Sequence, residues 1–107
     1  MINSIIIADS SELVIRGLKS IIKQFDRFEV HEALTLEDLQ LSIDRHPSSL
    51  LIIDYTTNVF SLDDVIDLKF KFPLVKIVAI THYINAQTVV QAVRAGIESH
   101  IKKECSV

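Results

Sequence analysis

Short apolar runs alternate along the chain with longer stretches in which apolar residues recur every three or four positions. The runs at 4–8 (SIIIA), 50–53 (LLII) and 76–80 (KIVAI) are almost continuous, a pattern typical of strands buried on both faces. Apolar and polar residues mix at 28–33 (FEVHEA) and 99–101 (SHI), which is typical of half-exposed strands. The patterns therefore predict central strands and edge strands of one sheet.

The stretches between these runs show the helical spacing of apolar residues. Ser10 or Ser11 can cap the first helix, and Thr35 with Asp38 resembles a capping box at the start of the second. Gly96 is the expected stop of the last helix. The apolar positions that we expect to face the core are Leu13, Gly17, Leu18, Ile21, Ile22, Phe25, Leu36, Leu39, Ile43, Leu62, Val65, Ile66, Phe70, Val89, Val90 and Val93.

The regular alternation of strands and helices predicts an α/β fold with a parallel sheet and helices on both faces. The continuous runs suit the central strands and the mixed runs suit the edges. This placement gives the strand order 2-1-3-4-5, the order of a flavodoxin-like, doubly wound sheet. We expect residues 1–107 to form a single domain.

The composition supports a folded domain and argues against several classes of protein. A hydrophobic fraction of 49% and a charged fraction of 23% are those of a globular chain rather than a disordered one. The apolar runs are too short to span a membrane, and the N-terminus lacks the features of a signal peptide. The net charge of −3 argues against nucleic-acid binding by this domain. Cys105 is the one cysteine, so we expect a reducing, cytoplasmic location.

Polar residues follow several strands at the points where each is predicted to end. Asp9 follows the first strand, Asp54 the third, Thr81 the fourth, and Lys102 and Lys103 the last. Because ligands bind at the carboxyl ends of the strands in such sheets, these side chains should converge on one rim. A carboxylate can attack a phosphoryl group, whose oxygens a lysine and a hydroxyl stabilise. No glycine-rich phosphate loop is present, so nucleotide binding has no support.

These residues, together with the segments IIIADSSELVIRGLKSII and AGIESHIKKE, resemble the receiver domain of bacterial two-component response regulators. The resemblance extends over essentially the whole chain. The stretch Arg16-Gly17-Leu18 is similar to that of regulators whose second domain is a LuxR-type helix-turn-helix.

The resemblance implies a role for each residue of the rim. Asp54 would be the phospho-acceptor, and Lys103 would pair with the phosphoryl group. Thr81 would be the switch hydroxyl, and His100 falls at the position of the switch aromatic residue. Phosphorylation of Asp54 would therefore be expected to change the positions of Thr81, at the end of the fourth strand, and of His100, in the fifth strand.

The sequence departs from the family at several points. By resemblance Mg2+ would be held by Asp9, Asp54 and Thr56, but Ser10 replaces a second acidic residue, so Mg2+ binding should be weak or lost. The loop YTTNVFSLDD lacks the family's proline and glycine, and His82 replaces a small residue. The family's fifth helix is missing from the chain, which we interpret as an N-terminal fragment of a longer regulator. Its absence should expose apolar surface and favour self-association.

The resemblance implies signal transduction rather than enzyme activity. A sensor histidine kinase or a small phosphodonor would phosphorylate Asp54, and the receiver would switch an output. A homodimer and a DNA-binding output domain for transcriptional regulation are the implied partners. The alternative is a degenerate receiver that acts as a phosphorylation-independent module for protein interaction or dimerisation. A small enzyme or a flavin-binding protein on the same fold is the weaker third interpretation.

The histidines do not form a recognisable metal-binding motif. A site built from His82, His100 and Asp54 would have no recurring ligand spacing. His31 and His46 are expected to be exposed to solvent.

Overall fold

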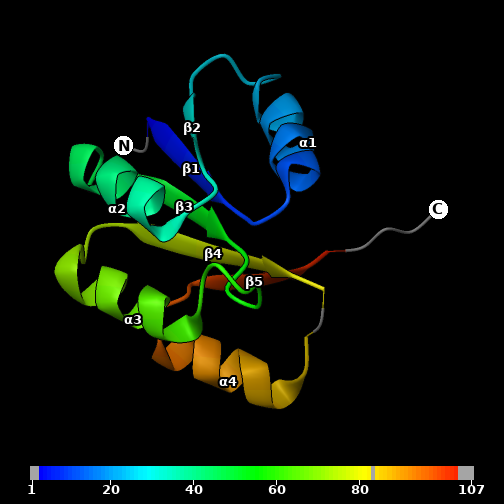
Figure 1. Ribbon diagram of the computed structural model, residues 1–107, viewed down its shortest axis with the longest axis vertical. Helices are drawn as coiled ribbons and strands as arrows, with labels where there is room; N and C mark the ends of the chain where they lie inside the picture. Colours follow the sequence, from blue (N-terminus) through cyan, green and yellow to red (C-terminus); the bar gives the residue numbers. More distant parts are fainter. Residues whose placement is uncertain (1–2, 83, 104–107) are drawn as a thin grey trace.

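The computed structural model describes residues 3–82 and 84–103, and Cys105 lies outside this part of the chain. Strands and helices alternate along it (Figure 1). The strands are β1 (Ser4–Ala8), β2 (Glu29–Ala33), β3 (Leu50–Ile53), β4 (Lys76–Thr81) and β5 (Ser99–Lys102). The helices are α1 (Glu12–Ile22), α2 (Leu36–Arg45), α3 (Leu62–Lys71) and α4 (Ala86–Arg94). Every predicted strand and helix is present.

The strands form one parallel sheet in the order β2-β1-β3-β4-β5, which confirms the predicted flavodoxin-like topology. Ala8, the last residue of β1, pairs with Ala33 of β2 and Ile53 of β3, so these strands end at the same level. Thr81 of β4 pairs with Lys102 of β5 in the same way. The segments that follow the strands therefore meet along one edge of the sheet, which we call the carboxyl edge.

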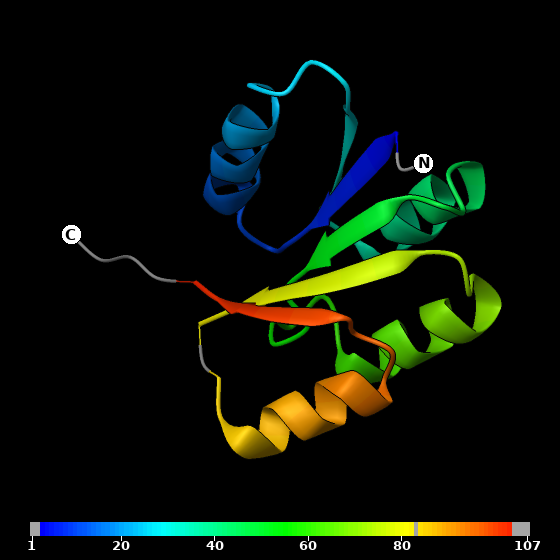
Figure 2. The ribbon, with the colours of Figure 1, turned by 180° about the vertical axis from the view of Figure 1, so that it is seen from behind.

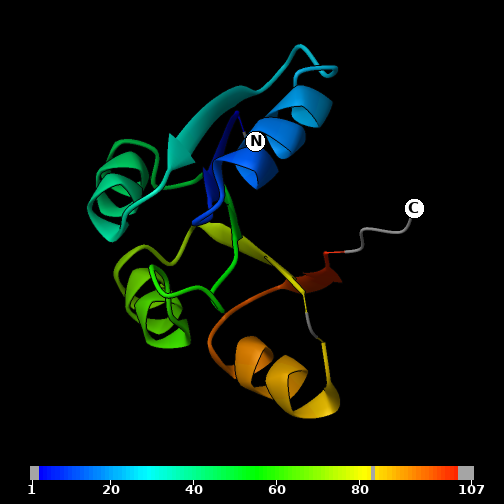
Figure 3. The same ribbon diagram turned by 45° about the vertical axis from the view of Figure 1, so that its right-hand side comes forward.

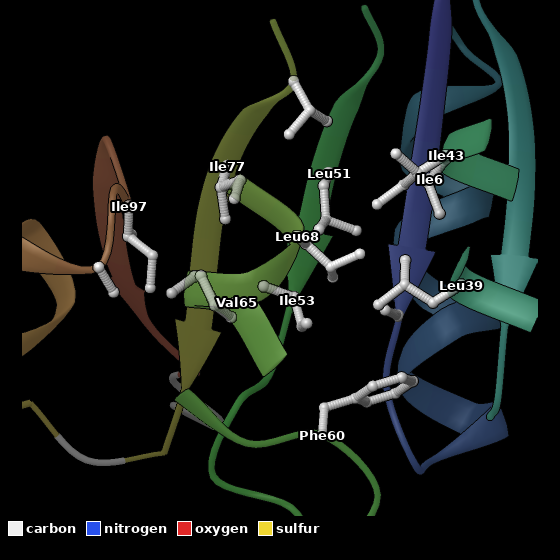
Figure 4. Close-up of a cluster of buried hydrophobic side chains, with 14 of the residues drawn as sticks. Ile6, Leu39, Ile43, Leu51, Ile53, Phe60, Val65, Leu68, Ile77 and Ile97 are labelled. Atoms are coloured by element: carbon white, nitrogen blue, oxygen red, sulfur yellow. The ribbon is translucent and has the colours of Figure 1, made fainter. Parts of the chain in front are cut away.

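Helices cover the two faces of the sheet unequally (Figures 1 and 3). α2, α3 and α4 pack on one face, where their buried side chains form one cluster with those of the strands. Figure 4 shows much of this cluster, which also contains the ring of Phe60 from the loop between β3 and α3. α1 packs on the other face, where Ile15 joins Ile5 and Ile7 of β1.

The face that carries α1 is only partly covered. Seen from behind, none of the four described helices lies in front of β4 and β5 (Figure 2). Val78 and Ile80 of β4 are correspondingly half-buried, and Ile101 of β5 is 48% exposed. Apolar surface is therefore exposed on this side of the described residues, and self-association through it stays a prediction.

Several helix positions predicted to face the core are exposed instead. In α1, Leu13 is 81% exposed, whereas Ile15, outside the predicted set, is buried. In α4, Val93 is largely exposed, and the smaller Ala92 packs on the sheet. Both apolar stripes are wider than the face that touches the sheet, so the spacing alone does not identify the buried side. The other predicted core positions that are exposed are Gly17, Ile21, Phe25, Ile66, Phe70 and Val90.

Local sequence explains where the helices begin and end. Ser11, rather than Ser10, caps α1. Thr35 accepts a hydrogen bond from the Asp38 amide at the start of α2, which is half of the predicted capping box. Gly96 follows α4 with a φ of 97°, a conformation that side chains with a β-carbon rarely adopt. Among the described helices, none combines the length and the hydropathy that a membrane span requires.

Candidate functional site

Two carboxylates follow neighbouring strands at the carboxyl edge. The Asp54 amide donates a hydrogen bond to the Ala8 carbonyl (3.1 Å), and the Asp9 amide donates to the Ala33 carbonyl (3.3 Å). Each residue thus extends the hydrogen bonding of the sheet beyond the end of its strand, which fixes its backbone. Both side chains are buried, with 5% of Asp9 and 2% of Asp54 exposed. Carboxylates so deeply buried need partners that offset the loss of water.

Lys103 supplies the opposite charge. Its Nζ lies 2.6 Å from Oδ2 of Asp54 and 2.8 Å from Oδ2 of Asp9. The Lys103 amide donates to the Thr81 carbonyl, which fixes the backbone just beyond the end of β5. The structure thus brings three predicted site residues into direct contact. One ammonium group between two carboxylates leaves the cluster with a formal negative charge.

The second oxygen of each carboxylate also has a partner. Oδ1 of Asp54 accepts hydrogen bonds from the Thr56 amide (2.9 Å) and from the Thr56 hydroxyl (2.5 Å). Oδ1 of Asp9 accepts from the Ser11 amide at 3.0 Å. Each carboxylate oxygen of the cluster therefore has at least one hydrogen-bond donor, and charge-assisted bonds of this kind hold the side chains in place.

Burial and hydrogen bonding oppose each other in setting the protonation of the cluster. Burial raises the pKa of Asp54, but hydrogen bonds from Lys103 and Thr56 outweigh it and hold the pKa below the ordinary value of 3.8. Burial lowers the pKa of Lys103, but its contacts with Asp54 and Asp9 raise the pKa above 10.5. Asp54 is therefore an ionised carboxylate at neutral pH, the form that acts as a nucleophile.

Thr57 organises the loop that follows Asp54, a role that the sequence analysis did not predict. Its hydroxyl donates to the Asp54 carbonyl (3.5 Å) and accepts from the amides of Val59 (3.2 Å) and Phe60 (3.1 Å). A threonine side chain thus supports the turn that a proline and a glycine would otherwise form. The signal in the sequence was the threonine pair that follows Asp54 and Tyr55 after the apolar run LLII.

Tyr55 connects the same loop to β5. Its hydroxyl lies 2.7 Å from Nε2 of His100, and the two rings meet edge to face. Burial lowers the pKa of His100 more than the charge of Asp54 raises it. Burial raises the pKa of Tyr55, and the charge of Asp54 raises it further. Both groups are therefore uncharged at neutral pH. The sequence analysis singled out His100 but not its partner.

An open pocket of about 370 Å³ lies beside the acidic cluster. It is lined by Asp9, Ser10, Ser11, Val14, Asp54, Thr56, Thr57, His82 and Lys103. His82 is exposed, so its imidazole can turn into solvent. Thr81 is completely buried and is not part of the lining. Contact between its hydroxyl and a ligand in the pocket therefore requires the end of β4 to move.

The cluster offers the hard oxygen ligands that Mg2+ binds. Asp9 and Asp54 face the pocket, and Thr56 lines it beside them. Lys103, however, already lies between the two carboxylates, so Mg2+ has to compete with an ammonium group for the same oxygens. Ser10 adds a hydroxyl where a carboxylate would add charge. The residues present therefore fit a weakly held Mg2+.

No protein-family model and no curated protein matches the sequence. Solved structures of response regulators match its fold. One from Thermotoga maritima has a TM-score of 0.86 at 20% identity, over 99% of this chain and 88% of its own. RcsB from Salmonella enterica serovar Typhimurium, bound to a promoter with the phosphomimetic BeF3-, has a TM-score of 0.83 at 20% identity over 98% of this chain. A Burkholderia pseudomallei response regulator with a phosphorylated aspartic acid, a calcium ion and citrate has a TM-score of 0.78 at 19% identity over 98% of this chain.

At these identities the likeness shows the fold. The chain has the fold of response-regulator receiver domains, a flavodoxin-like parallel sheet in the order 2-1-3-4-5. It spans 62% of the RcsB chain and 62% of the Burkholderia chain, so each of those proteins contains regions without a counterpart here. What this chain does chemically depends on its own residues.

Proposed function

We propose that the chain is a phosphorelay receiver that accepts a phosphoryl group on Asp54. The observation that carries this proposal is the position of Lys103 Nζ, within 3 Å of both Asp54 and Asp9 in the lining of an open pocket. A buried ammonium group there can offset the charge of an incoming phosphoryl group, while Thr56 holds the acceptor carboxylate. The receiver fold supports the same role.

The transfer can be written with the groups of this chain. An oxygen of the ionised Asp54 carboxylate attacks phosphorus and forms an O–P bond. The bond from phosphorus to the donor's leaving atom breaks, and its electron pair leaves with that atom. Lys103 then pairs with the phosphoryl oxygens. Asp9, Asp54 and Thr56 would hold Mg2+ weakly, and the bound ion would supply further positive charge to those oxygens.

Phosphorylation changes the hydrogen bonds and ion pairs that Lys103 and Asp54 can form. Two contacts connect these residues to the rest of the sheet and can transmit the structural change. The first is the loop after Asp54, which reaches β5 through the contact between Tyr55 and His100. The second is Thr81, whose carbonyl accepts from the Lys103 amide. Both connections end on the β4–β5 side of the sheet, so phosphorylation shifts the population between two arrangements of that side.

A receiver of this kind implies partners. A sensor histidine kinase or a small phosphodonor supplies the phosphoryl group in the cytoplasm, and the output is transcriptional regulation through a homodimer. The structure of RcsB on a promoter supports an output of that kind in a longer protein. The net charge of −3 argues against DNA binding by this domain itself. A separate output domain would bind the DNA, and the resemblance of Arg16-Gly17-Leu18 implies that it is of LuxR type.

Intact-protein mass spectrometry after incubation with acetyl phosphate, with and without Mg2+, tests the proposal. The expected result is a single phosphoryl adduct that is lost in Asp54→Asn. Asp63→Asn removes an exposed carboxylate on α3 and is the matched control, which should keep the adduct. A folded sample without any adduct, or an adduct that persists in Asp54→Asn, would contradict the proposal.

A second candidate function rests on the same ion pair. Lys103 occupies the space between the carboxylates of Asp9 and Asp54. Ser10, which lines the same pocket, contributes a hydroxyl rather than a further carboxylate. Both features oppose Mg2+ binding and favour a degenerate receiver that acts through protein interaction or dimerisation without phosphorylation. Such a protein would give no adduct and would keep its oligomeric state in Asp54→Asn.

A further inference from the structure

A second polar cluster lies at the opposite edge of the sheet, where the strands begin. Glu29 and His31 are two positions apart on β2, so their side chains point to the same face of the sheet. His46 is the C-cap of α2, which packs on that face and ends at the same edge (Figure 1). One ligand atom of each residue lies within 4.8 Å of the other two. Fold topology, rather than sequence spacing, brings these side chains together.

Packing holds the two histidines together. Their rings stack, with 4.3 Å between the centroids and 22° between the planes. The Ser4 hydroxyl lies 3.4 Å from Nδ1 of His46 and limits the rotation of that ring. Both side chains are half-buried, so the expectation that they are exposed was wrong. The expectation failed because the end of α2 lies over the start of β2.

Nε2 of His31 is shielded from solvent and makes no hydrogen bond within the described residues. Oε1 of Glu29 lies only 3.1 Å from this nitrogen, within ion-pair distance but outside hydrogen-bond geometry. Two ligand atoms that share a tetrahedral zinc ion at about 2.1 Å lie about 3.4 Å apart. The two atoms therefore already have nearly the separation that a shared metal ion imposes.

We propose that Glu29, His31 and His46 form a binding site for a transition-metal ion such as Zn2+. Two imidazoles and one carboxylate are donors that zinc prefers, whereas Mg2+ prefers oxygen ligands. If Nδ1 of His46 donates its proton to Ser4, the Nε2 lone pair is left for the metal, and the hydroxyl orients the ring. Arg45 is exposed, so its charge can stay in solvent away from the ion.

The site does not depend on the phosphorelay function, because it shares no residue with the acidic cluster at the carboxyl edge. Three protein ligands leave one position of a tetrahedral ion for water. A bound ion would tie the end of α2 to the edge strand β2. Because this geometry exists only in the folded chain, metal binding should raise the thermal stability.

Zinc titration of the tag-free Cys105→Ser chain against a chromophoric chelator tests the proposal, since that variant lacks the one thiol. We expect one ion per chain and a rise in melting temperature. His31→Gln or His46→Gln should weaken binding about tenfold or more. His82→Gln, which removes an exposed histidine at the other edge, and Asp54→Asn should leave the affinity unchanged. Mg2+ should not compete, and Co2+ should give the absorption bands of a tetrahedral site.

Absence of zinc binding in the folded parent would overturn the proposal. Unchanged affinity in the His31→Gln/His46→Gln double variant, or an equal loss in His82→Gln, would overturn it as well. Circular dichroism of each metal-free variant shows first whether it folds. If a histidine variant does not fold, Glu29→Gln decides the question, because its exposed side chain tolerates the change and its affinity should still fall.

Discussion

The hydroxyl of Tyr55 lies 2.7 Å from Nε2 of His100 and joins the residue after Asp54 to the last strand of the sheet. Nδ1 of His100 is buried and has no hydrogen bond within the described residues. The tyrosine is thus the side-chain partner that the structure gives this imidazole. A displacement of the loop at Asp54 must either move His100 with it or break this bond.

Tyr55→Phe keeps the ring and removes only the hydroxyl, so it isolates this hydrogen bond. We expect the free energy of unfolding to fall by about 1 kcal/mol, because the half-buried imidazole loses its hydrogen-bond partner. The NMR shift of His100 on addition of the phosphomimetic BeF3- should also become smaller. Urea unfolding and side-chain NMR measure the two effects. A coupling energy near zero in a double-mutant cycle with His100→Gln would contradict a direct interaction.

Lys103→Met removes the ammonium group that competes with Mg2+. The two carboxylates then lack a counter-charge, so we expect Mg2+ affinity to rise about tenfold or more, as measured by calorimetry. Without Mg2+ the free energy of unfolding should fall by about 3 kcal/mol, because the change leaves buried charges unpaired. Lys102→Met, which removes the same charge from an exposed neighbour outside the pocket lining, should leave the Mg2+ affinity unchanged. Unchanged Mg2+ affinity would mean that Lys103 is not the competing group.

The ion pair predicts how stability depends on pH. The pKa of Asp54 lies below 3.8 in the folded chain, so its contribution is complete above about pH 4 and is lost as the pH falls through the lower folded value. The pKa of Lys103 lies above 10.5, so its contribution is complete below that pH and is lost as the pH rises through the higher folded value. The pair therefore stabilises the fold fully between these limits.

The predicted loss of stability at low pH can be tested by urea unfolding of the parent and of Asp54→Asn. The measurements run from pH 3 to 7, a range chosen to bracket the carboxylate titration. The parent should lose stability more steeply on acidification, because the asparagine cannot be protonated. Asp63→Asn serves as the control and should keep the steep dependence. If the free energy of unfolding falls equally steeply with decreasing pH in the parent and in Asp54→Asn, the ion pair does not determine the loss of stability at low pH.

The fold could be predicted from the sequence because its signals are local. Continuous runs such as LLII and KIVAI distinguish buried central strands from the mixed edge strands, and that distinction was enough to order the sheet. The convergence of Asp9, Asp54 and a lysine followed from parallel topology, because residues after parallel strands share an edge. The choice of Lys103 over Lys102 came from the resemblance to receiver domains.

The features that the sequence did not reveal depend on contacts between distant segments. Tyr55 and His100 are 45 positions apart, and no local pattern predicts that their side chains meet. His31 and His46 stack only because α2 ends over the start of β2. In α1, the spacing of Leu13 predicts an apolar face but not which face the sheet covers. The first depends on the path of the loop between β3 and α3, and the other two depend on how helices are placed on the sheet. None of them can be read from periodicity.

Ser10→Asp tests whether a missing acid limits Mg2+ binding. Ser10 is exposed and lines the pocket beside Asp9, so an aspartate there can reach the same ion without disturbing the core. We expect Mg2+ affinity to rise about tenfold or more, because a further carboxylate adds both a ligand and a negative charge. Phosphorylation by acetyl phosphate should become faster at low Mg2+ concentration.

Ser20→Asp is the matched control, since it adds the same charge at an exposed position of α1 outside the pocket lining. A similar gain in Ser20→Asp would reveal a general charge effect rather than a ligand at residue 10. If Ser10→Asp has no effect while Lys103→Met tightens binding, the ammonium group is what weakens Mg2+ binding. If both variants tighten Mg2+ binding, the missing carboxylate at residue 10 and the ammonium group of Lys103 both weaken it. The aspartate would add one ligand, whereas Lys103 occupies the two carboxylates that would otherwise bind the ion.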